Sequence, residues 1–305
     1  MNALQHPLLT LEVCRIRIDF KARQKWEVYG KEPIFRGQMG RYLRQGCCPF
    51  YDDPGKDCEN CGLAKGCLYL KLFAPQTRNP SDPRPFVPVL EGENSQSMFQ
   101  KGEKGKAGLV LMGPAITYSS LFCEAALSAL GAFPLQTGPV QVEMPEGPVF
   151  SHEAEHAGRT LKEWAERDFV QGRECRGLRF VTPMRVTGKE RGLRDDVNFF
   201  VLMQALLRRL RDLKRAFDTD RDMGDSREIL DKAAQVQVRE NRLKWEKRER
   251  YSARQGQDVY LSGFTGYISF DREISDFYPL LKAAEIVHVG KGTSGGCGRV
   301  ELVGR

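Results

Sequence analysis

Residues 195–217 read DDVNFFVLMQALLRRLRDLKRAF and show a clear amphipathic pattern. The apolar positions recur at helical spacing and share one stripe, which comprises Phe200, Met203, Leu207, Leu210 and Phe217. A second stripe is basic and comprises Arg208, Arg211 and Arg215. The pattern therefore predicts a helix with an apolar face for the core and a basic face opposite.

The segments on either side of this helix define the second half of the chain. GLRFVTPMRVTG (177–188) predicts a strand before it, and VYLSGFTGYISF (259–270) predicts a strand pair or one long kinked strand after it. SDFYPLLKAAE (275–285) predicts a helix that Ser275 caps, and RVELV (299–303) a last strand. The order fits β-α-β-β-α-β, with the order of the middle strands left open.

The first half shows the same order of elements. LLTLEVCRIRIDF (8–20) alternates apolar and polar residues and predicts a strand from Leu9 to Ile18, while IFRGQMGRYLRQ (34–45) predicts a short basic helix. YSSLFCEAALSALG (118–131) predicts a helix that Ser119 or Ser120 caps and Gly131 ends. Three further strands are predicted at FVPVLEG (86–92), AGLVLMG (107–113) and PVQVEMP (139–145).

We therefore predict an α+β protein with two ferredoxin-like (RRM-like) units in tandem. The first unit is predicted at 1–150 and the second at 176–305, with a polar connector at 151–175. A cysteine-rich, metal-binding insertion at 47–67 belongs to the first unit.

Composition and charge narrow the class of protein. The chain has 305 residues and a formal net charge of +7, and residues 176–254 hold 21 Lys and Arg against 13 Asp and Glu, which suits a polyanionic partner. MNALQHPLLTLEV lacks the features of a signal peptide, and FFVLMQALL is far shorter than the roughly 20 residues of a membrane span. We expect a soluble, cytoplasmic protein without a membrane partner. The nine cysteines, an odd number, argue against a disulfide framework.

The cysteine-rich stretch GCCPFYDDPGKDCENCGLAKGCLYL (46–70) has the spacing C-C-x9-C-x2-C-x5-C. Four thiolates within about 20 residues suit one tetrahedral zinc ion, and an iron–sulfur cluster is the alternative. A structural role is favoured because four protein ligands leave no open position for catalysis. The remaining cysteines are interpreted as core, strand or loop residues: Cys14, Cys123, Cys175 and Cys297.

VHVGKGTSGGCGRVEL (287–302) contains five glycines between Gly290 and Gly298, with Lys291 and Arg299 beside them. The stretch matches G-x-G-x-x-G, but a dinucleotide site needs a strand before the motif and a helix after it, and here the order is reversed. A flexible turn is one interpretation. The other is a loop whose backbone N–H groups approach a phosphate chain, with the two cations adding charge.

Several blocks together resemble one known family. YSARQG (251–256), LSGFTGYISF (261–270) and LLKAAEIVHVGKGTSGGCGRVEL (280–302) are similar to the C-terminal signature of the CRISPR precursor-RNA-processing endoribonucleases of the repeat-associated mysterious protein (RAMP) superfamily. LRFVTPMRV (178–186) followed by the amphipathic helix resembles the opening of that family's second domain. FRGQMGRYLRQ (35–45), the cysteine-rich loop and CLYLKLFAP extend the resemblance over nearly the whole chain.

The resemblance implies antiviral CRISPR defence: cleavage of precursor crRNA within its repeats, and retention of the repeat end of the mature guide RNA. It also implies metal-independent chemistry, in which the ribose 2′-OH attacks the adjacent phosphate and leaves a 2′,3′-cyclic phosphate and a 5′-OH. Such a site needs a base, an acid and cations near the phosphate. Other subunits of a CRISPR effector complex are implied partners. The family pattern favours a metal-ligand set of Cys48, Cys58, Cys61 and Cys67, with Cys47 a substitute for Cys48.

Members of this family often carry a catalytic His on or near the first helix, but residues 34–45 contain no His. His288, two residues before the glycine loop, is the first candidate, and its side chain points either at the RNA or into the sheet. Tyr42 is the second candidate, with packing against the helix as the alternative, and Lys291 is a candidate phosphate stabiliser. His6, His152 and His156 are interpreted as solvated.

RENRLKWEKRERYSAR (239–254) carries seven cations with Trp245 and Tyr251 between them, so it fits either an RNA path or a solvated charged helix. With the basic stripe of the amphipathic helix, we favour the RNA path. The predicted RNA contacts are Arg41, Arg44, Arg208, Arg211, Arg215, Lys247, Arg248, Arg250, Tyr251, Arg254, Gly290, Gly292, Gly295, Gly296 and Arg299.

Two other functions fit the sequence. The first is a non-catalytic RAMP subunit that caps the repeat hairpin of a guide RNA in an effector complex. The second is a zinc-bearing adaptor between proteins and nucleic acid, without repeat specificity. Cleavage separates the endoribonuclease from both, and selective binding of one repeat hairpin separates the RAMP proteins from the adaptor.

Overall fold

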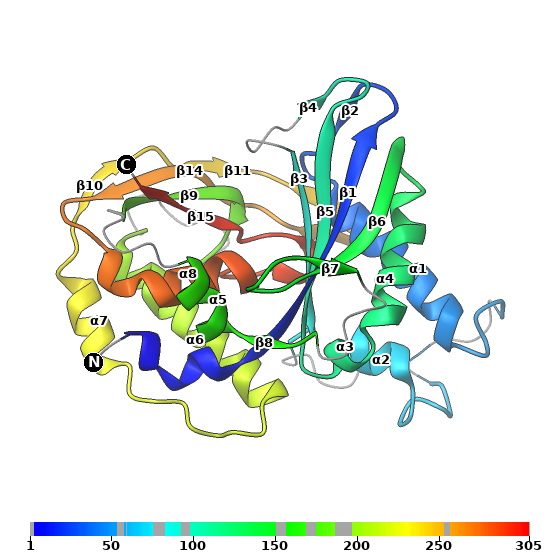
Figure 1. Cartoon of the computed structure of the whole chain (residues 1–305), viewed down its shortest axis with the longest axis horizontal. Helices are drawn as coiled ribbons and strands as arrows, with labels where there is room; N and C mark the ends of the chain where they lie inside the picture. Colours follow the sequence, from blue (N-terminus) through cyan, green and yellow to red (C-terminus); the bar gives the residue numbers. More distant parts are fainter. Residues whose placement is uncertain are drawn as a thin grey trace. The chain divides into compact units, whose positions relative to one another are not determined.

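The computed structural model shows a mixed α+β protein with antiparallel sheets, which confirms the predicted class (Figure 1). The chain divides into two compact units. Glu12–Gly158 form the first unit, and Met1–Leu11 together with Arg159–Arg305 form the second. The structure describes residues 3–53, 58, 60–75, 83–92, 98–150, 157–168, 175–186, 197–252 and 257–304.

The first unit is built on one antiparallel sheet. The strand order is β3 (Phe86–Gly92), β5 (Lys104–Met112), β1 (Glu12–Ala22), β6 (Leu135–Glu143) and β7 (Val149–Phe150). Helix α1 (Glu32–Cys47) follows β1, and α4 (Ser119–Leu130) follows β5. The smaller elements are β2 (Trp26–Glu27) paired with β4 (Met98–Phe99), α2 (Leu68–Leu72) and α3 (Pro114–Thr117).

Alternation along β1 explains how this sheet separates its two faces. Ile16, Ile18 and Phe20 are buried in the core together with side chains of α1 and α4, which lie on the same side of the sheet (Figure 1). Arg17 and Lys21 occupy the intervening positions and therefore point to the opposite face. The first unit thus has an apolar face under two helices and a charged face opposite.

The second unit has a sheet of strand order β10 (Val238–Asn241), β14 (Gly263–Phe270), β9 (Cys175–Met184) and β15 (Val300–Gly304). Helix α6 (Phe199–Phe217) follows β9, and α8 (Tyr278–Val287) follows β14. Phe199 of α6 packs against Phe270 and Phe277, with ring centroids 4.9 and 4.8 Å apart. The other elements are α5 (Leu161–Asp168), α7 (Arg227–Ala234), β8 (Arg159–Thr160), β11 (Lys244–Glu246), and the pair β12 (Glu249–Ser252) and β13 (Gln257–Tyr260).

The N-terminal segment belongs to the second unit, unlike the predicted division at 1–150 and 176–305. It forms two 3-10 turns, η1 (Ala3–Gln5) and η2 (Pro7–Thr10), and the first strand begins only at Glu12 instead of Leu9. Its anchor is Lys214 of α6, whose Nζ donates to the Pro7 carbonyl at 2.9 Å and to Thr10 Oγ1 at 2.7 Å. These contacts join residues more than 200 positions apart, so the local sequence pattern could not predict them.

Three predicted details of element ends and pairing are corrected. Neither Ser119 nor Ser120 is the N-cap of α4, which is Tyr118 without a capping side-chain bond. Ser275 begins a 3-10 turn, η7 (Ser275–Phe277), and α8 starts at Tyr278 with a proline in its first turn, where no N–H is required. Strands β13 and β14 do not pair with each other, since β13 pairs with β12 and β14 with β9.

No helix within the described ranges has both the length and the hydropathy needed to cross a bilayer.

Candidate nucleic-acid interface

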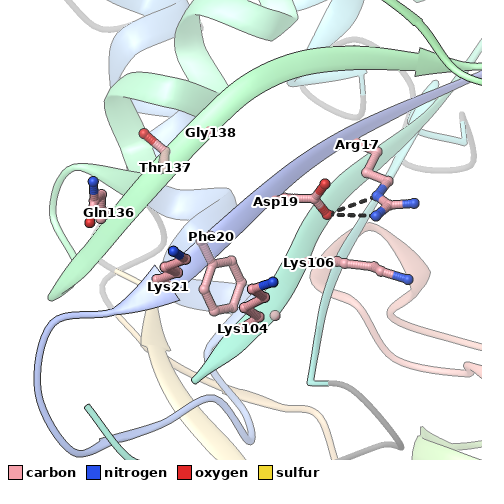
Figure 2. Close-up of a pocket in the computed structure, with 10 residues that line it drawn as sticks. Arg17, Asp19, Phe20, Lys21, Lys104, Lys106, Gln136, Thr137 and Gly138 are labelled. Carbon is pink, nitrogen blue, oxygen red and sulfur yellow. Dashed lines mark hydrogen bonds and ion pairs between the residues drawn. The ribbon is translucent and has the colours of Figure 1, made fainter. Parts of the chain in front are cut away.

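A basic hollow of about 370 Å³ lies on the charged face of the first unit's sheet. Figure 2 shows its cations along two neighbouring strands, with Arg17 and Lys21 on β1 and Lys104 and Lys106 on β5. Strand β6 closes one side of the hollow with Gln136, Thr137 and Gly138. We name this site the basic hollow.

A β-bulge shapes the basic hollow. The pairing of β1 with β6 shifts between Ile18 and Phe20, because Ile18 faces Val140 whereas Phe20 faces Thr137. The extra residue lies on β6, where a bulge bends the strand and increases its twist. Gly138 lies at this bulge and lines the hollow without a side chain to fill it.

The charges of the basic hollow are only partly balanced. Arg17 pairs with Asp19, with Nη2 2.8 Å from Oδ1. Lys21 and Lys104 are both exposed and stand directly opposite each other in the β1–β5 register. Like charges at opposed positions destabilise a sheet, so this pair favours a bound anion. Sequence reasoning missed these residues, although the alternating cations in RIRIDFK and KGK were a visible signal.

The glycine loop is a tightly bonded turn. Five of its N–H groups donate to backbone oxygens: Lys291 to Arg185, Gly295 and Cys297 to Gly292, Gly296 to Thr293, and Gly298 to Pro183. Glycine is required at Gly298, where φ is +78° and an added Cβ would clash with the Val289 carbonyl oxygen. Many of the backbone N–H groups that were predicted to bind a phosphate therefore already donate hydrogen bonds within the protein.

His288 lies inside the protein beneath this loop. It is 1 % exposed, has a φ of 55° unusual for a non-glycine residue, and bonds through Nδ1 to the Cys297 carbonyl oxygen at 3.1 Å. Burial lowers its pKa from 6.5 to about 3, and the nearby Arg299 adds to this effect. The ring is therefore neutral near pH 7 and holds the loop in place. Its burial argues against the predicted acid–base role.

The cations beside the glycine loop differ in exposure. Lys291 is exposed and can approach a phosphate, as can Gly292 next to it. Arg299 is half-buried and pairs with Glu301, with Nη2 2.9 Å from Oε1. Lys291 therefore carries the accessible charge of this loop, and Gly290, Gly295 and Gly296 shape it.

The basic stripe of α6 is divided by its contacts. Arg208 and Arg215 are exposed, so they remain available to RNA. Arg211 instead donates through Nη2 to Ser226 Oγ at 2.7 Å, and His6 Nε2 lies 3.1 Å from the same oxygen. Arg211 is thus bonded within the protein, and Arg215 forms an exposed ion pair with Asp212, with Nη1 3.6 Å from Oδ1.

Within the described part of this tract, residues 239–252, the chain forms strands rather than a charged helix. Lys247 is exposed, whereas Arg248 is half-buried and pairs with Glu246, with Nη2 2.8 Å from Oε1. The backbones of Arg250 and Tyr251 belong to β12, but their side chains, and the whole of Arg254, lie outside the described residues.

The predicted group on α1 consists of Arg41, Tyr42 and Arg44. Arg41 is exposed and donates through Nε to the Tyr51 hydroxyl at 3.4 Å. Tyr42 is partly buried and packs against the core of the first unit, in keeping with the alternative given for it above. The guanidinium of Arg44 interacts with the thiols of Cys48 and Cys58.

The cysteine cluster is not assembled as a metal site. Cys48, Cys58, Cys61 and Cys67 are all half-buried, but no three His, Cys, Asp or Glu side chains among the described residues are placed to hold one metal ion. Burial raises the pKa of the Cys47 thiol to about 11, and the neighbouring thiols of Cys67 and Cys48 add to this. The predicted zinc site stays a prediction.

Comparison with known families identifies the protein class. Residues 178–300 match the family model of the CRISPR-associated endoribonuclease Cas6, and residues 9–147 match a family model described as an N-terminal domain. The match of residues 178–300 supports the CRISPR-associated RAMP-like family that the sequence predicted. No curated protein sequence matches the chain.

Solved structures share the fold at low sequence identity. A partial Cas6-RT-Cas1–Cas2 complex is 12% identical, with a TM-score of 0.59 over 98% of this chain and 47% of that one. The Cas6-RT-Cas1–Cas2 complex is also 12% identical, with a TM-score of 0.59 over 98% of this chain. The match covers 29% of that complex's chain. A Cas6 product complex is 17% identical, with a TM-score of 0.53 over 95% of this chain and 100% of that one. The chain thus spans less than half of the first two proteins.

Proposed function

We propose that this protein is a CRISPR repeat-RNA endoribonuclease that cuts precursor crRNA within its repeats and stays bound to the repeat end. The match of residues 178–300 to the Cas6 endoribonuclease model carries this proposal. The basic hollow and the exposed cations of α6 support an RNA substrate, because they offer positive charge to a phosphate backbone.

The strand orders support two ferredoxin-like units. In the first unit, β1, α1, β3, β5, α4 and β6 follow one another along the chain, and the strands lie in the order β3-β5-β1-β6. In the second, β9, α6, β10, β14, α8 and β15 lie in the corresponding order β10-β14-β9-β15. We propose that both arise from the same β-α-β-β-α-β plan.

The proposed reaction is metal-independent attack of the ribose 2′-OH on the adjacent phosphate. It breaks the bond to the 5′-oxygen, which takes up a proton, and leaves a 2′,3′-cyclic phosphate. Of the predicted catalytic residues, Lys291 is exposed and suited to stabilise the charged phosphate, and Tyr42 stays a candidate for proton transfer.

The test is incubation of the purified protein with its host's repeat RNA in a chelating buffer, followed by mapping of both product ends. One cut that leaves a 2′,3′-cyclic phosphate and a 5′-OH supports the proposal. Lys291→Gln should then slow the single-turnover rate by 10-fold or more, since one cation at a phosphoryl transition state contributes on this scale. Unchanged RNA under all conditions contradicts the proposed activity.

Binding without cleavage is the second candidate function, and one observation favours it. The described first helix carries no His, and His288 is buried. A subunit that caps the repeat hairpin would bind one repeat selectively and leave it intact. Partnership with further CRISPR proteins is proposed for either function, in keeping with the Cas1–Cas2 complexes that share the fold.

Neutralising the basic hollow should weaken RNA binding through lost phosphate contacts. We expect Lys21→Gln with Lys104→Gln to reduce the slope of log K against log salt by about 1.4, because each single-strand contact contributes about 0.7. The double variant should also melt slightly higher, since the opposed like charges are removed. Lys65→Gln with Lys71→Gln, exposed in the same unit outside the hollow, is the control. Equal slopes for both double variants would exclude the hollow from the RNA path.

Metal analysis of the purified protein tests the predicted structural zinc, with an iron–sulfur cluster as the alternative outcome. Close to one zinc per chain is expected, and Cys61→Ser should abolish binding, whereas Cys175→Ser on β9 should not. Metal-free protein of native stability would contradict the site.

A further inference from the structure

Tyr260, at the end of β13, presents its ring to solvent. Its exposed fraction is 61%, the highest among the exposed large hydrophobic side chains of the described residues. The next residue, Leu261, is buried, because consecutive residues of an extended chain point to opposite sides. The ring therefore lies outside the apolar core, and its π face is available to a planar partner.

The backbone around Tyr260 is held by hydrogen bonds to the neighbouring strand. Tyr260 faces Glu249 in the register of β12 and β13, and the N–H of Leu261 donates to the Arg248 carbonyl at 2.7 Å. Ser262 Oγ accepts from the N–H of Arg248 at 3.0 Å. A tyrosine has only two side-chain torsions, so a ring on this bonded ribbon loses little conformational entropy when it binds a partner.

The residue after Tyr260 packs against the glycine loop. Leu261 Cδ2 lies 3.5 Å from the position that a Cβ of Gly292 would take, and Cys297 Sγ donates to the Leu261 carbonyl at 3.8 Å. Lys291, next to Gly292, is exposed. The backbone of Tyr260 is therefore one residue from a direct contact with the loop that carries an exposed cation.

The exposed charges near Tyr260 favour a polyanion. From β11 to the start of β12, the exposed side chains are Lys244, Lys247 and Glu249. Lys247 lies two residues before Glu249 and is thus a diagonal cross-strand neighbour of Tyr260, within reach of a long side chain. Lys291 adds a third cation on the adjoining loop. Three ammonium groups against one carboxylate attract phosphates, whereas the ring offers an uncharged face to a base.

We propose that Tyr260 stacks on one unpaired base of the bound RNA, while Lys247 and Lys291 contact the neighbouring phosphates. The proposal rests on the RNA-binding function above and adds single-stranded nucleotides to the part of the substrate that the protein binds. Stacking tolerates any sequence because every base has a π face, and the cations hold the backbone. Tyr260 thus contacts the RNA through its ring and not through charge.

Tyr260→Thr provides the test, because threonine suits a strand but has no ring. Repeat-RNA affinity should fall roughly 5- to 150-fold, the range of one base–aromatic stack. The slope of log K against log salt should stay unchanged, since no charge is removed. Tyr260→Phe should retain wild-type affinity, because phenylalanine keeps the π face. Wild-type affinity in Tyr260→Thr would overturn the proposal.

Val238→Thr is the matched control. Val238 is an apolar residue on β10 of the same unit and is 36% exposed, so its replacement should change RNA affinity little. Tyr260→Thr should melt close to wild type, since the ring lies outside the core. A large fall in its melting temperature would assign the ring a structural role instead. Weak RNA binding by Tyr260→Phe would assign the effect to the hydroxyl and overturn the stacking.

An abasic scan of the repeat identifies the stacked base. Each RNA carries one ribose without a base, and wild type should lose affinity at the position that stacks on Tyr260. Tyr260→Thr should be insensitive to the same change, because both losses remove one interaction. Losses that add at every position would show that the ring contacts no base.

Decaadenylate RNA separates this proposal from the proposed function. If the protein binds no repeat RNA selectively, the function fails, but at low salt wild type should still bind decaadenylate more tightly than an abasic ribose-phosphate strand of the same length. Tyr260→Thr should lose this preference, and Val238→Thr should keep it. Equal binding of the two strands by wild type would refute the stacking site itself.

Discussion

Lowering the pH from 7 to 5 should reduce the free energy of unfolding by about 2 kcal/mol through His288 alone. The folded pKa is about 3 because of burial and Arg299, against 6.5 in the unfolded chain. Between pH 3 and pH 6.5 the unfolded chain therefore binds more protons at His288 than the folded protein does. The stability is fully present above pH 6.5 and is lost progressively as the pH falls toward 3.

Denaturant unfolding of wild type and His288→Asn at several pH values measures this effect. Asparagine retains a donor for the Cys297 carbonyl and tolerates the positive φ, but it does not titrate. The variant should lose about 2 kcal/mol less than wild type between pH 7 and pH 5. Parallel pH profiles would show that the ring is not kept neutral by burial.

Lys214→Met should destabilise the second unit by roughly 3 kcal/mol, one of the largest effects of any single substitution. The Lys214 side chain is fully buried, and its Nζ donates to Pro7 O, Thr10 Oγ1 and, at 2.7 Å, to Asp220 Oδ2. Methionine fills the space of the chain but leaves the Pro7 carbonyl without this donor. Chemical denaturation measures the change.

Lys232→Met is the control for Lys214→Met. Lys232 lies on α7 of the same unit and pairs with Glu228 at 3.0 Å, but both side chains are half exposed. An exposed pair of this kind contributes less than about 0.5 kcal/mol. If the two variants lose equal stability, the buried ammonium is not the anchor of the N-terminal segment.

The regular elements could be predicted because their signals are local. The apolar stripe of α6 and the alternation along β1 follow directly from the spacing of residues such as Met203 and Ile16. The family followed from blocks such as LLKAAEIVHVGKGTSGGCGRVEL, which keep their order over the chain. Predicting these elements and the family required no knowledge of contacts between residues that are distant in the sequence.

The site residues depend on contacts that spacing does not encode. The sequence places His288 beside the glycine loop, but its inward orientation follows from a positive φ and a bond to Cys297. The basic hollow likewise requires Lys21 and Lys104 to pair across two strands.

The division of the chain bears on the order in which the protein folds during synthesis. Glu12–Gly158 form a compact unit from one continuous stretch, so this unit can fold as soon as it leaves the ribosome. Residues 3–11 are made earlier, yet their partners Lys214 and Ser226 are made more than 200 positions later. The N-terminal segment is therefore synthesised first but packs late, because it can dock only after helix α6 has formed.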